Sequence, residues 1–431
     1  MKNLLNIPIQ LTFDNQGHTL HHNQIESFDE NFLVFDTRND DTKIGETQFI
    51  KIIDLKTLEI STLYSTDNQS KFGPGVGAAT FSPKENNVIF IHGIRNSDEN
   101  KPYSATRRTG VSVNLDYPNQ AVFMDARNIY TPFTAGALRG GTHSHSWHQN
   151  GKWISFTYND YVLEEESKKN PLIKDQRVVG MMFPKDVEVP LDHNLENNNG
   201  KMFSIIVSKV TNEAKNGSKE IEKAFDECWI NETNNIAFQG NVRDKNGKLK
   251  TEIFVASIPN QINFDEKDNF NGTNTTLPDV PQCITQKRIT FTENGISNFR
   301  HWLRSSPCGK INYFLMEDSS KISQIFGVEL TSSKVSQYTF LDNNIDSPFT
   351  ISKDGKYAIF FSDNKIYNTD LANKNSEIVY DSFNNNNYLT GIPHFSKNGK
   401  KIYFNQFVRH QNNELYIQIF YLEIEFLKSD C

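Results

Sequence analysis

The sequence has little cysteine and no long apolar run. It holds four cysteines in 431 residues, and none of them forms a CxxC pair. This wide spacing argues against a zinc knuckle or a thioredoxin-type pair, and so few thiols are typical of a reducing compartment. No apolar stretch approaches the roughly 18 residues of a membrane helix, and the first residues lack the apolar core of a signal peptide. We therefore expect a cytoplasmic protein without a membrane partner.

An excess of basic charge is also missing. Lys and Arg together number 45 against 52 Asp and Glu, which gives a net charge of −7 at pH 7. Non-specific nucleic-acid binding needs a basic field, so we expect no nucleic-acid partner. The glycine-rich residues 71–80 lack the Gly-Lys-Ser/Thr end of a phosphate loop, and no G-x-S-x-G nucleophile elbow occurs. We therefore expect neither a nucleotide or organic cofactor nor a hydrolase of the prolyl-peptidase type.

One local pattern recurs seven times along the chain. Each copy has a polar turn with Gly or Asn, then Lys or Asn, then an apolar stretch that ends in Phe. The copies occupy residues 27–35, 82–90, 148–156, 230–238, 306–314, 352–360 and 396–404. Asn and Gly accept the positive φ of a tight turn, so each copy predicts a β-hairpin. The last three copies start 46 and 44 residues apart, which matches the roughly 40–50 residues of a four-stranded propeller blade.

The repeats predict an all-β protein with a single seven-bladed β-propeller domain over residues 1–431. Longer intervals between the early copies indicate insertions at about 95–120, 158–200 and 258–290. The first apolar strand, Ile7–Phe13, precedes every hairpin, so we expect it to pair with the last blade and close the ring. Two alternatives stay open: a six-bladed ring, because Glu26 stands where an apolar residue is expected, and two packed β-sandwiches.

The hairpins resemble those of the TolB-like β-propellers, whose repeat reads approximately x-W/F-S-P-D-G-K-x-I-x-F. The most similar copies are Thr80–Phe90 (TFSPKENNVIF) and His394–Phe404 (HFSKNGKKIYF). The block Asp125–Asp160 resembles an uncharacterised bacterial subfamily of cytoplasmic TolB-like proteins. By architecture the chain is also distantly similar to oligogalacturonate lyase. That resemblance implies a divalent metal in the channel, usually Mn²⁺, held by His and Gln ligands during β-elimination from a uronate.

Histidines are the densest candidates for chemistry. His143 and His145 are two residues apart in the expected innermost strand of the third blade, so they share one face of a regular strand. Neutral imidazoles are common ligands of Mn, Zn and similar ions. The predicted metal ligands are His22, Gln24, His143, His145, His301 and His394, with Mn, Zn or Ca as the metal. The alternative is that each histidine fills a polar slot between blades and bonds to the backbone.

Arginines form a second group of candidates, because their planar guanidinium suits carboxylate or phosphate. The predicted ligand-binding residues are Arg107, Arg108, Arg127 and Arg177. In an enzyme, a histidine or Tyr158 is the candidate base, and Arg107, Arg108 or Arg139 is the candidate carboxylate clamp. The alternative is that the arginines pair with Asp116, Asp125, Asp160 or Glu164–Glu166.

Three functions follow from these candidates. The first is a propeller that binds an anionic saccharide or a partner protein on the face around its channel. The second is a metal-dependent lyase acting on an acidic sugar. The third is a structural or sensory propeller with no small ligand. Convergence of His145, His301 and His394 in one funnel favours the enzyme, and their separation between blades favours binding.

Overall fold

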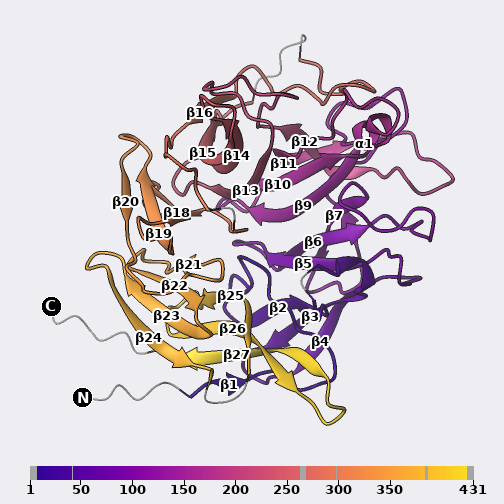
Figure 1. Ribbon diagram of the computed structural model, residues 1–431. Coiled ribbons are helices and arrows are strands. Elements are labelled where there is room, and N and C mark those ends of the chain that lie inside the picture. The colour runs from indigo at the N-terminus through magenta and orange to yellow at the C-terminus, as the bar shows by residue number, and fades with distance from the viewer. Residues whose placement is uncertain (1–6, 41, 263–267, 298, 384–386, 425–431) are drawn as a thin grey trace.

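Seven small antiparallel sheets surround a common axis in the computed structural model of the protein (Figure 1). The structure describes residues 7–40, 42–262, 268–297, 299–383 and 387–424. Within these residues one sheet has three strands and six have four. This arrangement confirms the seven-bladed β-propeller and is neither a six-bladed ring nor a pair of sandwiches.

The blades follow one another in chain order. Blade 1 comprises β2 (Phe32–Asp36), β3 (Phe49–Asp54) and β4 (Ile60–Ser65). Blade 2 comprises β5 (Val76–Phe81), β6 (Asn87–Gly93), β7 (Arg108–Asn114) and β8 (Val122–Phe123). Blade 3 comprises β9 (Gly140–Trp147), β10 (Ile154–Asp160), β11 (Val178–Val187) and β12 (Gly200–Ile206). Blade 4 comprises β13 (Ala224–Trp229), β14 (Ile236–Arg243), β15 (Leu249–Ser257) and β16 (Thr285–Arg288).

The later blades are built in the same way. Blade 5 comprises β17 (Arg304–Ser305), β18 (Ile311–Glu317), β19 (Ser323–Glu329) and β20 (Val335–Gln337). Blade 6 comprises β21 (Thr350–Ile351), β22 (Tyr357–Ser362), β23 (Lys365–Asp370) and β24 (Asn375–Asp381). Blade 7 comprises β25 (Leu389–Phe395), β26 (Lys401–Arg409), β27 (Leu415–Glu423) and β1 (Ile9–Gln10).

Helix is scarce. The 3₁₀ turn η1 (Ile44–Glu46) lies between β2 and β3 of blade 1, and α1 (Tyr161–Ser167) lies in the β10–β11 connection. The Asp160 side chain caps α1 by accepting a hydrogen bond from the backbone N–H of Leu163. Among the described residues, no helix has the length and apolar character needed to span a membrane.

The first strand closes the ring, as the sequence predicts. Ile9 of β1 lies opposite Tyr421 of β27, and the backbone N–H of Leu11 donates to the carbonyl of Ile419 at 2.8 Å. The Thr12 hydroxyl in turn accepts from the backbone N–H of Ile419. Both ends of the chain therefore belong to one sheet, which covers the outer edge of β27.

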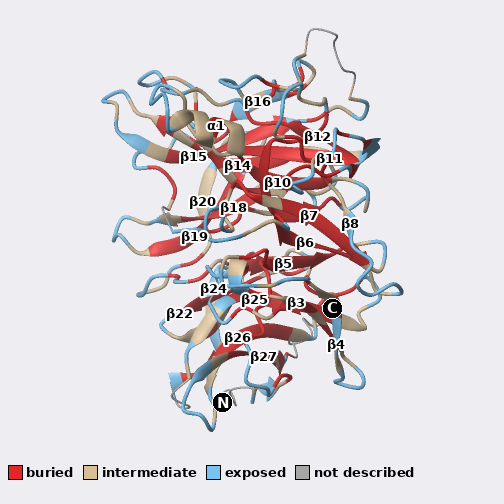
Figure 2. Cartoon of the chain, turned by 90° about the vertical axis from the view of Figure 1, so that its right-hand side faces the viewer, coloured by how far each residue is buried: buried red, intermediate tan, exposed pale blue. Residues whose placement is uncertain are grey.

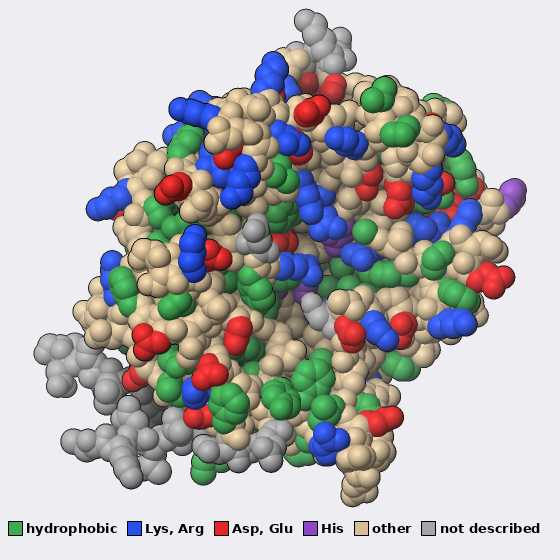
Figure 3. All heavy atoms as spheres, in the orientation of Figure 1, with side chains coloured by type: hydrophobic (Ala, Val, Ile, Leu, Met, Phe, Trp, Pro, Cys, Tyr) green, Lys and Arg blue, Asp and Glu red, His purple; other side chains and the backbone are tan. Residues whose placement is uncertain are grey.

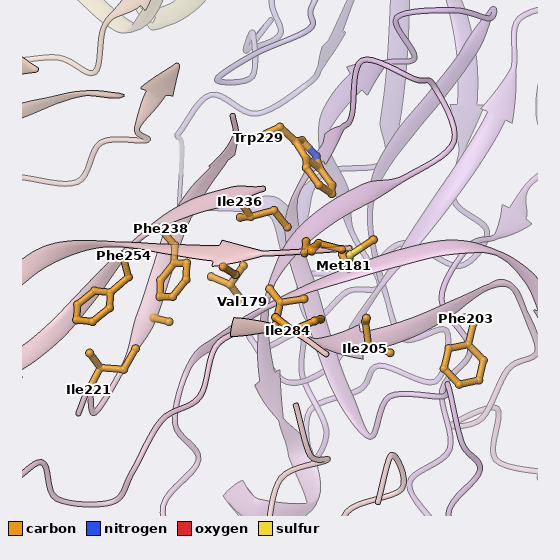
Figure 4. Packing of buried hydrophobic residues seen from close by; sticks show 14 of the residues in the cluster. Val179, Met181, Phe203, Ile205, Ile221, Trp229, Ile236, Phe238, Phe254 and Ile284 are labelled. Carbon is orange, nitrogen blue, oxygen red and sulfur yellow. The ribbon is translucent and has the colours of Figure 1, made fainter. Parts of the chain in front are cut away.

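The hairpin repeats form the packing between blades. The phenylalanine that ends each copy is at most 1% exposed in all seven blades, and the strands of the ring are largely buried (Figure 2). Figure 4 shows one such interface, where Val179 and Met181 of β11 lie close to Ile236 and Phe238 of β14. Each fully buried Phe stabilises the ring by about 1.5–3 kcal/mol, so the repeated Phe is a structural feature of every blade.

The innermost strands of several blades share one irregularity. The pairing of the innermost strand with its neighbour shifts register in blades 2, 3, 4 and 7. At each shift one residue has a positive φ: Ala78, Ser144, Asp226 and Gly391, at 59°, 57°, 49° and 72°. A β-bulge leaves one residue unpaired and re-aims its neighbours. The bulges therefore decide which side chains the inner strands turn toward the axis.

Candidate functional site

Four of the residues around the axis share one position of the repeat. Six residues before the start of a hairpin copy stand His21, Arg300, Asp346 and Thr390 in blades 1, 5, 6 and 7. All four line a single pocket of about 300 Å³. Because its walls come from blades on opposite sides of the ring, this pocket lies at the axis.

We call this the histidine pocket. Besides the four residues just named, it is lined by Thr19, Leu20, His22, Phe299, Trp302, Pro348, Gly391, Ile392, Asn405 and Ile417. The rings of His22 and Trp302 stack in parallel, with centroids 4.1 Å apart, and His21 meets His22 edge to face at 4.3 Å. The pocket therefore combines aromatic faces with imidazole nitrogens.

A second pocket of about 300 Å³ adjoins the first, since Phe299 and Arg300 line both. We call it the cationic pocket; its other lining residues are Arg177, Lys223, Phe225, Asp226, Gln239, Asn241, Thr251 and Ser297. Figure 3 shows a hollow in the middle of this face, with histidine at its floor and Lys and Arg side chains around it. Positive charge thus gathers in a hollow of an acidic protein.

The charges of the cationic pocket are not balanced. It holds three cations, Arg177, Lys223 and Arg300, against the single carboxyl of Asp226. The nearest approach of Arg300 Nε to Asp226 Oδ1 is a long 4.0 Å. Burial raises the pKa of Asp226 to about 6 although all three cations lower it. An added anion would therefore meet a net positive site.

The axial histidines are neutral and incompletely bonded. Burial lowers the pKa of His21, His22 and His143 well below the ordinary value for histidine; nearby arginines add to this for His21 and His143, and the neighbouring His21 and then arginines do so for His22. Both ring nitrogens of His22 and of His143 are buried without a hydrogen-bond partner among the described residues, and so is His21 Nε2. Buried polar atoms in proteins are generally paired with protein, water or ligand. These atoms therefore mark the part of the site where a polar partner is missing.

The bulge at Ser144 separates two residues that a regular strand would keep together. His143 pairs with Thr157 in the ladder, but Ser144 and His145 fall in the register shift. His145 Nε2 lies 3.0 Å from the Thr142 hydroxyl, and a Cβ on Gly110 of β7 would lie 2.8 Å from the same nitrogen. The expected common face of His143 and His145 is thus corrected: His145 lies between blades 2 and 3.

Three other predicted metal ligands have structural contacts. His301 Nδ1 lies 2.7 Å from the Phe299 carbonyl, and its Nε2 accepts from the Leu315 backbone N–H. Gln24 exchanges two hydrogen bonds with the backbone of Trp147. The polar atoms of His301 and Gln24 thus hold backbone groups together, and these are the same atoms that a metal would need. His394 keeps one buried, unpartnered nitrogen, Nε2.

Glu196, a carboxylate that the sequence does not single out, forms ion pairs with two of the predicted arginines. Arg107 Nη1 donates to Glu196 Oε1 at 2.7 Å, and Arg127 Nη2 lies 3.6 Å from Glu196 Oε2. Burial acts to raise the pKa of Glu196, but hydrogen bonds from Arg107 and Asn96 outweigh it and lower the pKa to about 2. Arg107 and Arg127 are 3% and 0% exposed and hold the β6–β7 connection against Glu196. A role in ligand binding would require this pairing to open.

The predicted catalytic pair is also structural. Arg139 Nη2 donates to Asp160 Oδ2 at 2.6 Å, and its guanidinium also reaches the carbonyls of Thr273 and Thr276. The Tyr158 hydroxyl donates to the same carboxylate and accepts from the Arg139 backbone N–H. Burial raises the pKa of Tyr158 well above its ordinary value. The predicted base, Tyr158, and the predicted clamp, Arg139, are thus both buried and hydrogen-bonded to Asp160.

Arg108 and Arg177 stay near the axis. Both are half-buried, and together they are the largest influences after burial on the pKa of His143. Arg177 lines the cationic pocket, and its Nε donates to Asn159 Oδ1 at 2.9 Å. Arg108 lies over the ring of Tyr103 at 4.7 Å.

Sequence analysis misses Lys223, Phe299, Arg300 and Trp302, although part of their signal is in the repeats. Arg300 and Trp302 stand six and four residues before the copy that starts at Ser306, where blade 1 has His21 and Asn23. Aligning the residues before each hairpin would have found them.

A metal centre is not assembled in this arrangement. Across the described ranges, no group of three His, Cys, Asp or Glu side chains is placed to hold a metal ion. The donor atoms exist, in His22 and His143 above all, but they do not form a ligand set.

The fold and the site define a class: a seven-bladed β-propeller with a cationic, histidine-floored funnel at one end of its axis. The chain is 34% identical over 367 residues to "Uncharacterized protein YidR" of Escherichia coli (strain K12). The match covers 83% of this chain and 85% of YidR. The protein therefore belongs to the YidR family. A family described as "Protein of unknown function (DUF3748)" matches residues 75–197, which hold blade 2 and the first strands of blade 3.

Solved structures share the fold. The structure "Oligogalacturonate lyase in complex with manganese" is 10% identical, with a TM-score of 0.57 over 97% of this chain and 93% of the lyase. TolB from Acinetobacter baumannii is 13% identical, with a TM-score of 0.38 over 96% and 86% of the two chains. The similarity to the lyase structure confirms, at the level of the propeller fold, the architecture expected from the sequence.

Proposed function

We propose that this protein binds a carboxylate-bearing saccharide in the funnel at the axis of the propeller. The observation that carries the proposal is the cationic pocket, whose described lining residues include Arg177, Lys223 and Arg300 but a single carboxyl, that of Asp226. A ligand carboxylate can accept hydrogen bonds from two guanidinium groups there, and charge-assisted bonds of this kind are about twice as strong as neutral ones.

The rest of the pocket suits a sugar. The rings of Phe225 and Phe299 offer apolar faces, and the amides of Gln239 and Asn241 offer polar contacts to hydroxyl groups. The hollow is concave and close to 300 Å³, a shape typical of small-ligand sites and unlike a flat protein interface. We therefore favour an acidic saccharide over a partner protein. The lyase that shares the fold is named for oligogalacturonate, which is an acidic saccharide. This name supports an acidic saccharide as the ligand class here.

The test compares galacturonate with galactose, which differ in the carboxylate alone, by calorimetric titration of the full chain. We expect galacturonate to bind at least tenfold more tightly, and Lys223→Gln to weaken it about tenfold, which corresponds to about 1.4 kcal/mol. Lys245→Gln is the matched control, because Lys245 is exposed in the same blade outside the pocket. Equal binding of the two sugars, or equal loss in both variants, would overturn the proposal.

A metal-dependent lyase is the second candidate. Two observations favour it: the unpartnered nitrogens of His22 and His143, and the manganese named with the oligogalacturonate lyase structure. The described side chains do not provide three converging ligands, so we assign no reaction step to a metal. Elemental analysis of protein purified without a chelator or a His-tag tests it. Near-stoichiometric Mn, Zn or Ca that is lost in His143→Phe would support the lyase, and no metal after dialysis against each ion would exclude it.

A further inference from the structure

The funnel holds two pockets of different chemistry that meet at one side chain. Arg300 lines both, with Nε 4.0 Å from Asp226 on one side and its guanidinium 4.6 Å from the Trp302 ring on the other. A ligand whose acid group engages Arg300 from the cationic pocket therefore extends past this side chain into the histidine pocket. The chemistry of the histidine pocket therefore determines which group the ligand carries next to its acid group.

The histidine pocket offers neutral polar atoms and no cation of its own besides the shared Arg300. Both ring nitrogens of His22, Nε2 of His21 and the indole Nε1 of Trp302 are buried without a partner among the described residues. The three side chains are 1%, 8% and 5% exposed. A neutral imidazole presents one donor and one acceptor, and an indole presents one donor. Hydroxyl groups, which donate and accept, complement that set.

The other walls of the pocket fit an uncharged ring. Leu20, Pro348, Ile392 and Ile417 supply apolar surface opposite the polar atoms. Asp346 stands at the rim, exposed, with Oδ2 accepting from the backbone N–H of Asp363. A second ligand carboxylate in this pocket would face the Asp346 carboxylate with no further cation, and like charges at short range repel.

We propose that the histidine pocket is a second subsite that takes an uncharged, hydroxyl-bearing sugar unit, so that the preferred ligand joins an acidic sugar to a neutral one. The inference rests on the proposed function, because the acidic unit occupies the cationic pocket. It adds the identity of the neighbouring unit, and it separates this funnel from one built for a chain of uronates alone.

The experiment titrates the full chain with three probes: galacturonate, a disaccharide of galacturonate linked to neutral rhamnose, and digalacturonate. We expect the mixed disaccharide to bind at least tenfold more tightly than galacturonate, and digalacturonate to bind no more tightly than galacturonate. If galacturonate itself does not bind, the proposed function fails and the inference with it. If galacturonate binds and the neutral unit adds nothing, or if digalacturonate is the tightest ligand, the inference alone is overturned.

Two variants assign the effect to the pocket. His22→Phe keeps an aromatic ring on Trp302 but removes both nitrogens, so the mixed disaccharide should fall to the affinity of galacturonate. The matched control is His193→Phe, since His193 is exposed and does not line the pocket. Asp346→Asn removes the charge at the rim, and it should raise the affinity for digalacturonate several-fold more than that for the mixed disaccharide. Equal effects of Asp346→Asn on both disaccharides would contradict the role given to its charge.

Discussion

Replacing Glu227 by Gln should make the protein more stable at alkaline pH. Glu227 lies in β13, is 1% exposed, and accepts a hydrogen bond from the Thr157 hydroxyl at 2.8 Å. Burial raises the pKa of its carboxyl from 4.5 to about 8. The folded protein therefore binds a proton that the unfolded chain has released between these two pH values, and stability falls as pH rises through this window.

The size of the effect follows from the same pKa values. Each pH unit in the window costs about 1.4 kcal/mol, so the wild type loses up to about 5 kcal/mol between pH 4.5 and pH 8 on account of this group. Gln has the same shape, can accept from Thr157 through its amide oxygen, and does not titrate. The variant should therefore differ little from the wild type at pH 5 and should be about 3–5 kcal/mol more stable at pH 8.5.

The assay is urea unfolding of both proteins at half-unit steps from pH 5 to pH 9. Other titrating groups are common to the two chains and cancel in the difference. The control is Glu59→Gln, an exposed residue for which we expect a difference that does not change with pH. Parallel stability curves for the wild type and Glu227→Gln across the whole range would refute the assignment of a protonated, buried Glu227.

Three further predictions concern the architecture of the site. Glu196→Ala leaves two buried arginines without their carboxylate and should cost about 3–5 kcal/mol in denaturant unfolding; a loss below 1 kcal/mol would mean that the clamp is solvated. His301→Phe should lower the free energy of unfolding by about 2–4 kcal/mol because two backbone groups lose their partner, whereas His143→Phe should change it by less than about 1 kcal/mol. Equal effects at the two histidines would show that His143 is structural as well. Leu11→Ala, beside the closing strand, should cost about 2–5 kcal/mol and lower the melting temperature, and an unchanged melting temperature would mean that ring closure adds little.

The architecture was predictable because it follows from short-range patterns. A Gly or Asn turn between alternating apolar residues has one good solution, a hairpin, and seven copies at blade spacing have few arrangements other than a ring. The unpaired strand Ile7–Phe13 had to cover an edge, so its place beside β27 also followed. Even the axial positions are encoded, since His21, Arg300, Asp346 and Thr390 stand at the same offset from the hairpins.

Only the tertiary structure decided which side chains share the funnel. The bulge at Ser144 interrupts the period of two on which the pairing of His143 with His145 relied. The partner of Arg107 is Glu196, 89 residues further along the chain, and no local pattern reports a contact between two loops at that separation. Strand periodicity places a residue at the axis, but backbone irregularities and long-range charge pairs determine whether its side chain holds the fold together or stays free for a ligand.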